Sequence, residues 1–339
     1  MDEDDVPSRA NPRGSRPRSK QRPKHMDAAD GMVVAVDRGR YGVLVGDIAV
    51  TAMRARELGR KGIAVGDQVS VVGDLTGEPD ALARVVRIAE RTTVLRRTAD
   101  DDDPLERIIV VNADQLVIVT ALADPEPSFG FIDRCLVAAL SAGLEPLLCL
   151  TKSDLASPEQ TLQRYAPLSV PAVITHRGAA LDELLERLRG NMSVLVGHSG
   201  VGKSTLINAL VPDAHRAIGI VSAVGKGRHT SSSAIALPLP AGSGWVIDTP
   251  GVRSFGLAHV TADDLLWAFP DLEDGANQCP PGCEHLDPAA GCVLDEWVAA
   301  GNSTPDRLAA FRRLLASRPS GSGAGSGSEG GPDSAIESA

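Results

Sequence analysis

Between residues 31 and 95, short apolar runs of β-type composition are separated by Gly and Asp turns. Five short strands within about 65 residues favour a small closed β-barrel such as an OB-fold. Barrels of this kind often bind RNA. Tyr41 is the only aromatic residue here, so an RNA contact would depend on charge and shape, and a purely structural barrel is the alternative. The predicted strands are Met32–Val36, Tyr41–Val45, Ile48–Ala52, Gln68–Val72 and Arg84–Ile88.

After a charged linker at 96–105, apolar strands and helical patterns alternate. This alternation predicts a mostly parallel α/β sheet with helices on both faces, in which ligands bind beyond the carboxyl ends of the strands. The predicted strands lie at Gln115–Ala121, Pro146–Leu150, Ala172–Thr175, Ser193–Val196, Ala234–Leu239 and Trp245–Ile247. Helices are predicted at Ile132–Ala142 and Leu181–Leu188, from Thr205 onward, and at Ala262–Phe269 and Pro305–Ala316.

The two ends of the chain differ from the parts between them. Residues 1–30 are rich in Arg, Pro, Ser and Asp and are predicted to be disordered. The last residues are rich in Gly and Ser and are predicted to be flexible. Seven Lys or Arg and no acid occur between Arg9 and Lys24, which suits either a phosphate-backbone contact or a solubilising tail. We predict five segments: a basic tail (1–30), the barrel (31–95), an α/β domain (96–256), a helical domain (257–317) and a flexible tail (318–339).

Composition limits the class of protein. No apolar run approaches the roughly 18 residues of a membrane helix, and the N-terminus lacks the apolar region of a secretory signal. We therefore expect a soluble cytoplasmic protein without membrane contact. The formal net charge is −10, but residues 255–339 alone carry 4 basic and 13 acidic residues. Because local charge decides nucleic-acid binding, the acidic total does not exclude an RNA partner.

Residues 197–204 fit the pattern G-x-x-x-x-G-K-[ST] of a phosphate-binding loop, with a predicted strand before it and a predicted helix after it. Glycines let the backbone approach a phosphate, and the N–H groups at the helix start attract it. Lys203 is placed to contact the β- and γ-phosphates and Ser204 to ligate Mg²⁺. The predicted phosphate-binding residues are Gly197, His198, Ser199, Gly200, Val201, Gly202, Lys203, Ser204 and Thr205.

A second motif, Thr151-Lys152-Ser153-Asp154, follows a predicted strand. A carboxylate at Asp154 could accept hydrogen bonds from both N1–H and the N2 amino group of guanine, a pair that adenine lacks. Lys152 could lie along the base, and a backbone N–H at Thr175–His176 could meet guanine O6. Alone, T-K-x-D is more often a helix-cap turn. Together with the phosphate loop, it predicts that the ligand is a guanine nucleotide, GTP, rather than an adenine nucleotide.

Two further stretches complete the predicted site. In Asp248-Thr249-Pro250-Gly251, which follows an apolar strand, Asp248 could hold Mg²⁺ and the Gly251 N–H could meet a γ-phosphate. Gly227-Arg228-His229-Thr230 precedes another strand, and Thr230 could also ligate Mg²⁺. The predicted magnesium ligands are therefore Ser204, Thr230 and Asp248.

The order of these motifs is unusual for a GTPase, because the base-reading loop precedes the phosphate loop in the chain. A circular permutation would give this order and still leave all loops at one edge of the sheet, since the termini of domains often lie close together. It would also lead Asp248–Gly251 directly into the C-terminal domain, so that a nucleotide-dependent shift of this loop could move that domain.

Three of the five cysteines cluster with a histidine near the C-terminus. The set Cys279, Cys283, His285 and Cys292 offers three thiolates and one imidazole, which suits a structural zinc ion without a catalytic water. Unrelated buried cysteines are the alternative. The other two cysteines stand alone in apolar segments and are interpreted as core residues.

The motif order, the loop at 227–230, the preceding barrel and the following Cys/His cluster resemble the RsgA (YjeQ/EngC) family of circularly permuted GTPases. The resemblance covers roughly residues 31–317. It implies a GTP phosphohydrolase that acts in late maturation of the small (30S) ribosomal subunit, binds that subunit and its 16S rRNA, and is stimulated by the ribosome. It also implies Mg²⁺ and one structural Zn²⁺ as cofactors. We expect a monomer and no DNA partner.

The chain departs from the common GTPase pattern at several positions, of which two bear on base reading and on catalysis. Thr151 stands where many GTPases have Asn, so one amide that braces the loop is absent. Val252 occupies the position where Ras-like enzymes use Gln to orient water, and valine cannot do so. Another group must therefore place the nucleophile. His229 is the candidate, by resemblance and by its place in a loop with Thr230, and a plain surface histidine is the alternative.

Two other functions stay open from the sequence. One is a regulatory GTPase that binds another RNA or a protein and is not specific to the small subunit. The other is an RNA chaperone for which the nucleotide is only a ligand. Co-sedimentation with small or large ribosomal subunits tests the first, and phosphate release from GTP tests the second.

Overall fold

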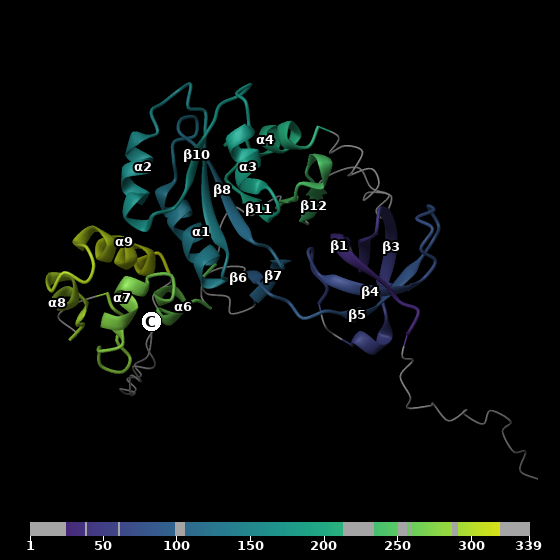
Figure 1. Cartoon of the computed structure of the whole chain (residues 1–339), viewed down its shortest axis with the longest axis horizontal. Helices are drawn as coiled ribbons and strands as arrows, with labels where there is room; N and C mark the ends of the chain where they lie inside the picture. Colours follow the sequence, from purple (N-terminus) through teal and green to yellow (C-terminus); the bar gives the residue numbers. More distant parts are fainter. Residues whose placement is uncertain are drawn as a thin grey trace, which may run out of the picture.

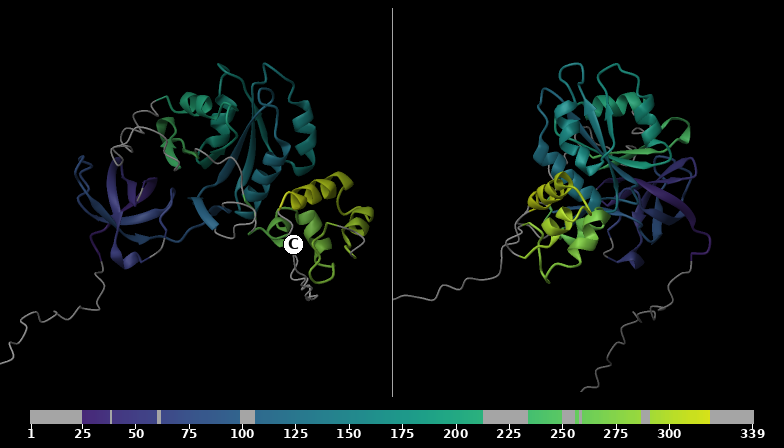
Figure 2. Two further views of the ribbon diagram at one scale, coloured as in Figure 1. Left: turned by 180° about the vertical axis from the view of Figure 1, so that it is seen from behind. Right: turned by 60° about the vertical axis from the view of Figure 1, so that its left-hand side comes forward.

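The computed structural model describes residues 25–37, 39–59, 62–98, 106–212, 234–249, 256–257, 259–286 and 291–318. Three parts follow one another along the chain: a β-barrel, an α/β sheet and a group of helices (Figure 1). The α/β part lies between the other two, and the view from behind shows the same arrangement (Figure 2).

The barrel contains the five predicted strands, each close to its predicted position. They are β1 (Ala29–Asp37), β2 (Arg40–Val45), β3 (Ile48–Arg54), β4 (Gln68–Gly73) and β5 (Ala83–Ile88), with a 3₁₀ turn η1 (Arg56–Leu58). Because β1 pairs with both β2 and β4, the barrel is closed. Its core contains Val33, Val43 and Val71, all without exposed surface. Tyr41 is buried with them, so it offers no surface on which a base could stack.

A buried ion pair ties the start of β4 to the segment after β5. Asp67 has no exposed surface, and its two carboxylate oxygens accept hydrogen bonds from Nε and Nη2 of Arg91, both at 2.8 Å. The backbone N–H of Ala64 donates to the same carboxylate at 2.8 Å, and Arg91 also donates to the carbonyl of Gly62 at 2.7 Å. The hydrogen bonds from Arg91 raise the pKa of its guanidinium. Both charges are therefore fully compensated inside the fold.

Replacing Arg91 with Ala is expected to lower the free energy of unfolding by about 3–5 kcal/mol, because it leaves the Asp67 carboxylate buried without its cation. Chemical denaturation followed by circular dichroism measures the loss. The double variant Arg91→Ala/Asp67→Asn should regain part of the stability, since the remaining buried group is then neutral. A loss below about 1 kcal/mol in the single variant would contradict this role.

The central sheet confirms the predicted α/β class. Its strands are β8 (Gln115–Ala121), β9 (Glu145–Thr151), β10 (Ala172–Ile174), β11 (Met192–Val196), β12 (Ile235–Pro238) and β13 (Trp245–Asp248). They lie in the order β10-β9-β8-β11-β13-β12, and all neighbours are parallel except β12 and β13. Helices α1 (Phe129–Ser141) and α2 (Glu159–Tyr165) pack on one face, and α3 (Asp182–Leu188) and α4 (Lys203–Leu210) on the other. Two 3₁₀ turns are η2 (Ala166–Leu168) and η3 (Pro240–Gly242).

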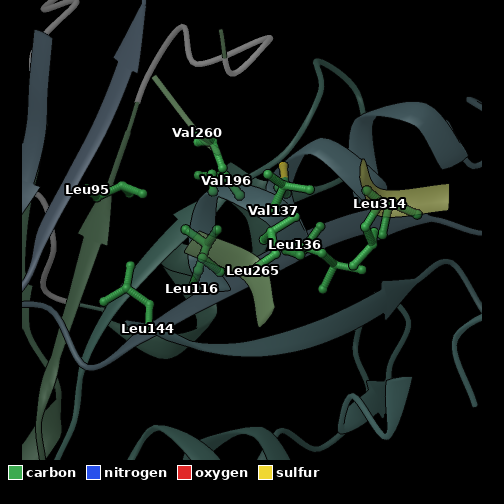
Figure 3. Packing of buried hydrophobic residues seen from close by; sticks show 14 of the residues in the cluster. Leu95, Leu116, Leu136, Val137, Leu144, Val196, Val260, Leu265 and Leu314 are labelled. Carbon is green, nitrogen blue, oxygen red and sulfur yellow. The ribbon is translucent and has the colours of Figure 1, made fainter. Parts of the chain in front are cut away.

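The face covered by α1 shares its core with the C-terminal helices. These are α6 (Asp263–Leu266), α7 (Pro270–Ala276), α8 (Leu294–Ala299) and α9 (Pro305–Ala316). Leu116 of β8, Leu136 of α1, Leu265 of α6 and Leu314 of α9 lie in one cluster (Figure 3). The helix predicted at Pro305–Ala316 is confirmed, whereas the one predicted at Ala262–Phe269 is shorter. In the described part of the chain, no helix has the length and apolar character that a bilayer crossing requires.

A two-stranded ribbon occupies part of the predicted linker. β6 (Val94–Thr98) pairs antiparallel with β7 (Glu106–Val111), so the linker prediction is wrong for residues 96–98. Residues 99–105 lie outside the described residues. Leu95 and Val110 are buried, while Arg96 and Glu106 form a half-exposed ion pair at 2.5 Å. Because charged residues occupy the outer positions, the sequence of this ribbon does not show the apolar pattern of a buried strand.

The barrel contacts the central sheet at one place and the β6–β7 ribbon at another. Ala35 of β1 pairs with Ile235 of β12, so a barrel strand continues the sheet beyond its antiparallel edge. Gly66 lies against β7 so closely that a Cβ would be 2.0 Å from the carbonyl oxygen of Val111. Only glycine permits this approach.

Candidate functional site

The carboxyl ends of β8, β9, β10, β11 and β13 meet at one edge of the sheet. The helix that follows β8 covers one face, whereas the helix that follows β11 covers the other. In open α/β sheets, ligands bind in the crevice where the connections diverge in this way. The described residues of the motifs predicted after β9, β11 and β13 all lie at this edge, despite the unusual order of these motifs along the chain.

The phosphate-loop motif connects β11 to α4. Gly197 has no room for a side chain, because a Cβ would lie 2.5 Å from the carbonyl oxygen of Val119. Gly202 has a φ of 93° and directly precedes the first helical residue, Lys203. The ammonium group of Lys203 forms an ion pair with the carboxylate of Asp248 at the end of β13. The lysine predicted to contact phosphates and the carboxylate predicted to hold Mg²⁺ therefore lie side by side.

The base-reading motif is fastened to the phosphate loop by a hydroxyl group. Thr151 is buried, and its Oγ1 donates a hydrogen bond to the carbonyl of Val201 at 2.6 Å. The backbone N–H of Ser153 donates to the carbonyl of Thr175 at 3.2 Å, which links the same motif to the loop after β10. The hydroxyl group of Thr151 therefore braces this loop, as the side-chain amide of Asn would at the same position. These two hydrogen bonds therefore hold the three loops together.

Thr151→Val keeps the shape of the side chain but leaves the Val201 carbonyl without this donor. We expect the affinity for GDP to fall about tenfold, because an unpaired buried polar group costs about 1–3 kcal/mol. Thr151→Ser keeps the hydroxyl and should stay within about twofold of the original affinity. Calorimetric titration compares the variants. Equal affinities for the Val and Ser variants would show that the hydroxyl braces nothing that the nucleotide needs.

A cavity of about 330 Å³ opens between the base-reading loop, the loop after β10 and the start of α4. Predicted residues that line it are Thr151, Lys152, Thr175, His176, Gly200, Val201, Gly202 and Thr205. Asp154 is exposed and does not line the cavity in this structure. The sequence did not identify the further lining residues Arg177, Gly178, Ala179, Leu181, Leu206 and Ala209. The sequence could have indicated them only by their position, because they follow β10 directly or lie within the first two turns of α4.

The remaining predicted residues are placed as follows. His198 and Ser199 line a second cavity of about 470 Å³ on the α1 side of the phosphate loop, and the His198 ring lies 4.2 Å from that of Phe131. Ser204 follows Lys203 in the first turn of α4, at the same edge as Asp248. Thr230, His229 and Gly251 lie outside the described residues.

The predicted metal ligands come together in the C-terminal part. One ligand atom from each of Cys279, Cys283, His285 and Cys292 lies within 4.8 Å of all the others. A tetrahedral zinc site with bonds of about 2.0–2.3 Å spaces its ligands roughly 3.5–3.8 Å apart. Nδ1 of His285 and Sγ of Cys292 are 3.9 Å apart, close to that spacing. Three sulfur atoms and one nitrogen with this separation fit a zinc ion.

The surroundings of the cluster act on its ligands in opposite directions. Burial raises the pKa of the Cys279 thiol to about 11, so a metal ion would have to displace its proton. Burial also lowers the pKa of His285, which favours the neutral imidazole that can ligate a metal. The backbone N–H of Val293 donates to Sγ of Cys279 at 3.3 Å, and Nε of Arg312 donates to the carbonyl of His285 at 3.0 Å. Such outer contacts orient ligands in metal sites.

Comparison with known proteins gives a consistent match. A family model described as RsgA GTPase matches residues 88–258. The small ribosomal subunit biogenesis GTPase RsgA of Pseudomonas aeruginosa PAO1 is 42% identical over 221 residues, which are 62% of this chain and 64% of that protein. The protein of the same name from Pseudomonas fluorescens SBW25 is 38% identical over 248 residues, 70% of this chain and 71% of that protein. The chain thus spans less than two thirds of the P. aeruginosa relative.

Two solved structures share the fold. One is YloQ, described as a circularly permuted GTPase, with a TM-score of 0.60 and 23% identity over 87% of this chain and 96% of that one. The other is YjeQ from Thermotoga maritima, with a TM-score of 0.58 and 24% identity over 85% of this chain and 98% of that one. The predicted fold class, a permuted P-loop GTPase fold between a barrel and a helical part with a Cys/His cluster, is confirmed.

Proposed function

The chain belongs to the RsgA GTPase family, and on that premise we propose that it hydrolyses GTP to GDP and phosphate during late maturation of the small (30S) ribosomal subunit. We propose further that it binds this subunit and its 16S rRNA, and that the ribosome stimulates hydrolysis. The observation that carries the proposal is the convergence of the loops after β9, β10 and β11 around a cavity of about 330 Å³, with Asp248 at the end of β13 paired with Lys203 at the same sheet edge.

In this proposal each of the predicted site residues has its own role in binding. The backbone of Gly197–Ser204 surrounds the phosphates, and Lys203 contacts the β- and γ-phosphates. Asp154 reads the guanine edge, at the end of the loop that Thr151 fastens to Val201. Mg²⁺, when bound, would neutralise charge on the phosphates. Its protein ligands would be Ser204, Thr230 and Asp248.

Hydrolysis needs a group that orients the attacking water, and Val252 has no polar atom for this purpose. We propose His229 for that role, with Thr230 beside it, and a low basal rate that the ribosome raises by ordering this loop. The zinc site, held by Cys279, Cys283, His285 and Cys292, has a structural role only, because four protein ligands leave no position for a reactive water.

The proposed partners follow from the family. The barrel and the helical part would contact the small subunit on either side of the α/β part, in a cytoplasmic monomer. The domain divisions proposed are 31–95 for the barrel, 96–256 for the GTPase part and 257–317 for the helical part.

GTP turnover with and without purified small subunits tests the proposal. We expect phosphate release to rise several-fold with small subunits and to be unchanged with large subunits. No release under either condition would reject the enzyme, and stimulation or co-sedimentation with another partner alone would favour a different regulatory GTPase. His229→Ala is compared with the unmodified protein in the presence of small subunits, and equal rates would reject His229 as the water-orienting group.

A further inference from the structure

The Cys/His cluster would carry a net negative charge when it holds a zinc ion. Cysteine ligates zinc as the thiolate and histidine as the neutral imidazole, so Zn²⁺ and the three thiolates together carry one negative charge. Cys292 is 7% exposed and His285 is 4% exposed, so water screens this charge poorly. A buried charge of this kind needs a nearby charge of opposite sign or hydrogen-bond donors.

Arg312 of α9 is a cation that contacts two of the four ligand residues. Its Nη2 lies 3.9 Å from Sγ of Cys292, and its Nε donates to the carbonyl of His285 at 3.0 Å. The Arg312 side chain is itself only 20% exposed. Because little water lies between them, the positive charge acts on the cluster with little screening.

A second contact fixes the direction of the Arg312 guanidinium. Nη1 and Nη2 donate to the two carboxylate oxygens of Asp295 at 2.9 and 2.6 Å. Such a two-bond pair sets the plane of the guanidinium as well as its position. The Asp295 side chain is 44% exposed, so water screens its charge more than it screens that of the cluster.

We propose that Arg312 compensates the negative charge of the zinc-loaded cluster, and that Asp295 aims its guanidinium at Cys292. This inference rests on the proposed zinc site and adds the residue that sets how tightly the metal is held. Arg312 binds no metal itself and acts through the ligands, so it is a positioning residue. Residues that contact metal ligands in this way commonly change metal affinity by 10–100-fold when replaced.

The competing role for Arg312 is purely structural, in which it only packs α9 against the loop of the cluster. The two roles differ in what a replacement must supply. Charge compensation requires a cation near Cys292, which lysine supplies and glutamine does not. A structural hydrogen bond to the His285 carbonyl requires only an N–H donor, which the glutamine amide also has.

The zinc affinity of the full chain is measured by competition with a chromophoric chelator, and Co²⁺ is substituted to report the ligand geometry by absorption. For Arg312→Gln we expect the Kd for zinc to rise about 10–100-fold with a tetrahedral Co²⁺ spectrum retained. Arg312→Lys should stay within about threefold of the original Kd. Arg307→Gln is the matched control, because Arg307 lies in the same helix and binds Asp271 and the Pro167 carbonyl instead of the cluster. It should bind zinc as the original protein does.

The outcomes separate this inference from the zinc site on which it rests. If the original protein binds no zinc, the zinc site itself fails. If it binds zinc and Arg312→Gln binds it equally well, charge compensation alone is rejected. Equal losses in the Lys and Gln variants, an equal loss in Arg307→Gln, or a lost tetrahedral Co²⁺ spectrum in Arg312→Gln would assign Arg312 a structural role and also reject it. None of these measurements uses GTP, so the proposed hydrolysis is tested separately.

Discussion

Replacing Lys203 with Ala is expected to lower kcat/KM for GTP by about 10²–10³-fold, the loss that follows removal of one preorganised charge stabiliser in an active site. Lys203 begins α4, directly after Gly202, and its ammonium group lies against the carboxylate of Asp248. With nucleotide bound, the Lys203 ammonium group would contact both the phosphate oxygens and the Asp248 carboxylate. The variant therefore removes the lysine contact to the β- and γ-phosphates and leaves Asp248 without its partner.

The control for this experiment is Ser204→Ala, which changes the neighbouring residue in the same turn of α4. Ser204 is proposed as a Mg²⁺ ligand, so its loss should shift the Mg²⁺ concentration needed for half-maximal turnover. Lys203→Ala should leave that concentration nearly unchanged and lower the plateau rate instead. Steady-state phosphate release at several Mg²⁺ concentrations distinguishes the two variants. A kcat/KM for Lys203→Ala within threefold of the original would exclude the phosphate role of this lysine.

The barrel could be predicted almost strand by strand because local pattern and tertiary structure agree there. Gly and Asp turns separate strands whose buried residues form one core, as Val33, Val43 and Val71 show. The central strands could be predicted equally well, because β8 is buried at every position and its sequence is a continuous apolar run. The contact of Ala35 with Ile235 could not be predicted from the sequence, because it joins residues 200 positions apart in the chain through backbone pairing alone.

Elements with little buried surface were missed. Helix α2 buries only Thr161 and Tyr165, so its sequence carries no apolar stripe. The β6–β7 ribbon buries Leu95 and Val110 but presents charged residues on its other face, which resembles a polar linker. In both cases tertiary packing, rather than local preference, decides the structure.

The candidate site was predicted where motifs have fixed spacing and missed where contacts are made between loops. The motif already implies glycine at positions 197 and 202, and the structure gives the cause of each. A side chain has no room at Gly197, and Gly202 has a positive φ. The hydrogen bond from Thr151 to Val201 spans 50 residues, and the sequence pattern showed only that the usual amide is absent at this position, not that the hydroxyl makes this contact. Arg177 carries no motif at all, and only its position beside the cavity identifies it.

The Cys/His cluster is connected to the α/β sheet through α9. Arg312 of α9 donates to the His285 carbonyl at 3.0 Å and to the Asp295 carboxylate at 2.6 Å. The next residue, Arg313, lies 3.4 Å from Asp133, a carboxylate of α1 that is only 4% exposed. A change in the cluster should therefore extend beyond its ligands and loosen the packing of α9 on α1.

Chelation, or Cys292→Ala, is expected to remove the proposed zinc ion and unfold the helices around the cluster. Structural zinc contributes about 10–16 kcal/mol, as much as the whole stability of a typical domain. Metal analysis should find one zinc per chain, and its removal should accelerate hydrogen exchange in α7, α8 and α9 but not in β8, β9 and β11. Cys149→Ala is the matched control, because this cysteine packs in the core on the α3 side of the sheet and should not affect zinc. Zinc-free protein with undiminished exchange protection in α9 would refute the structural role.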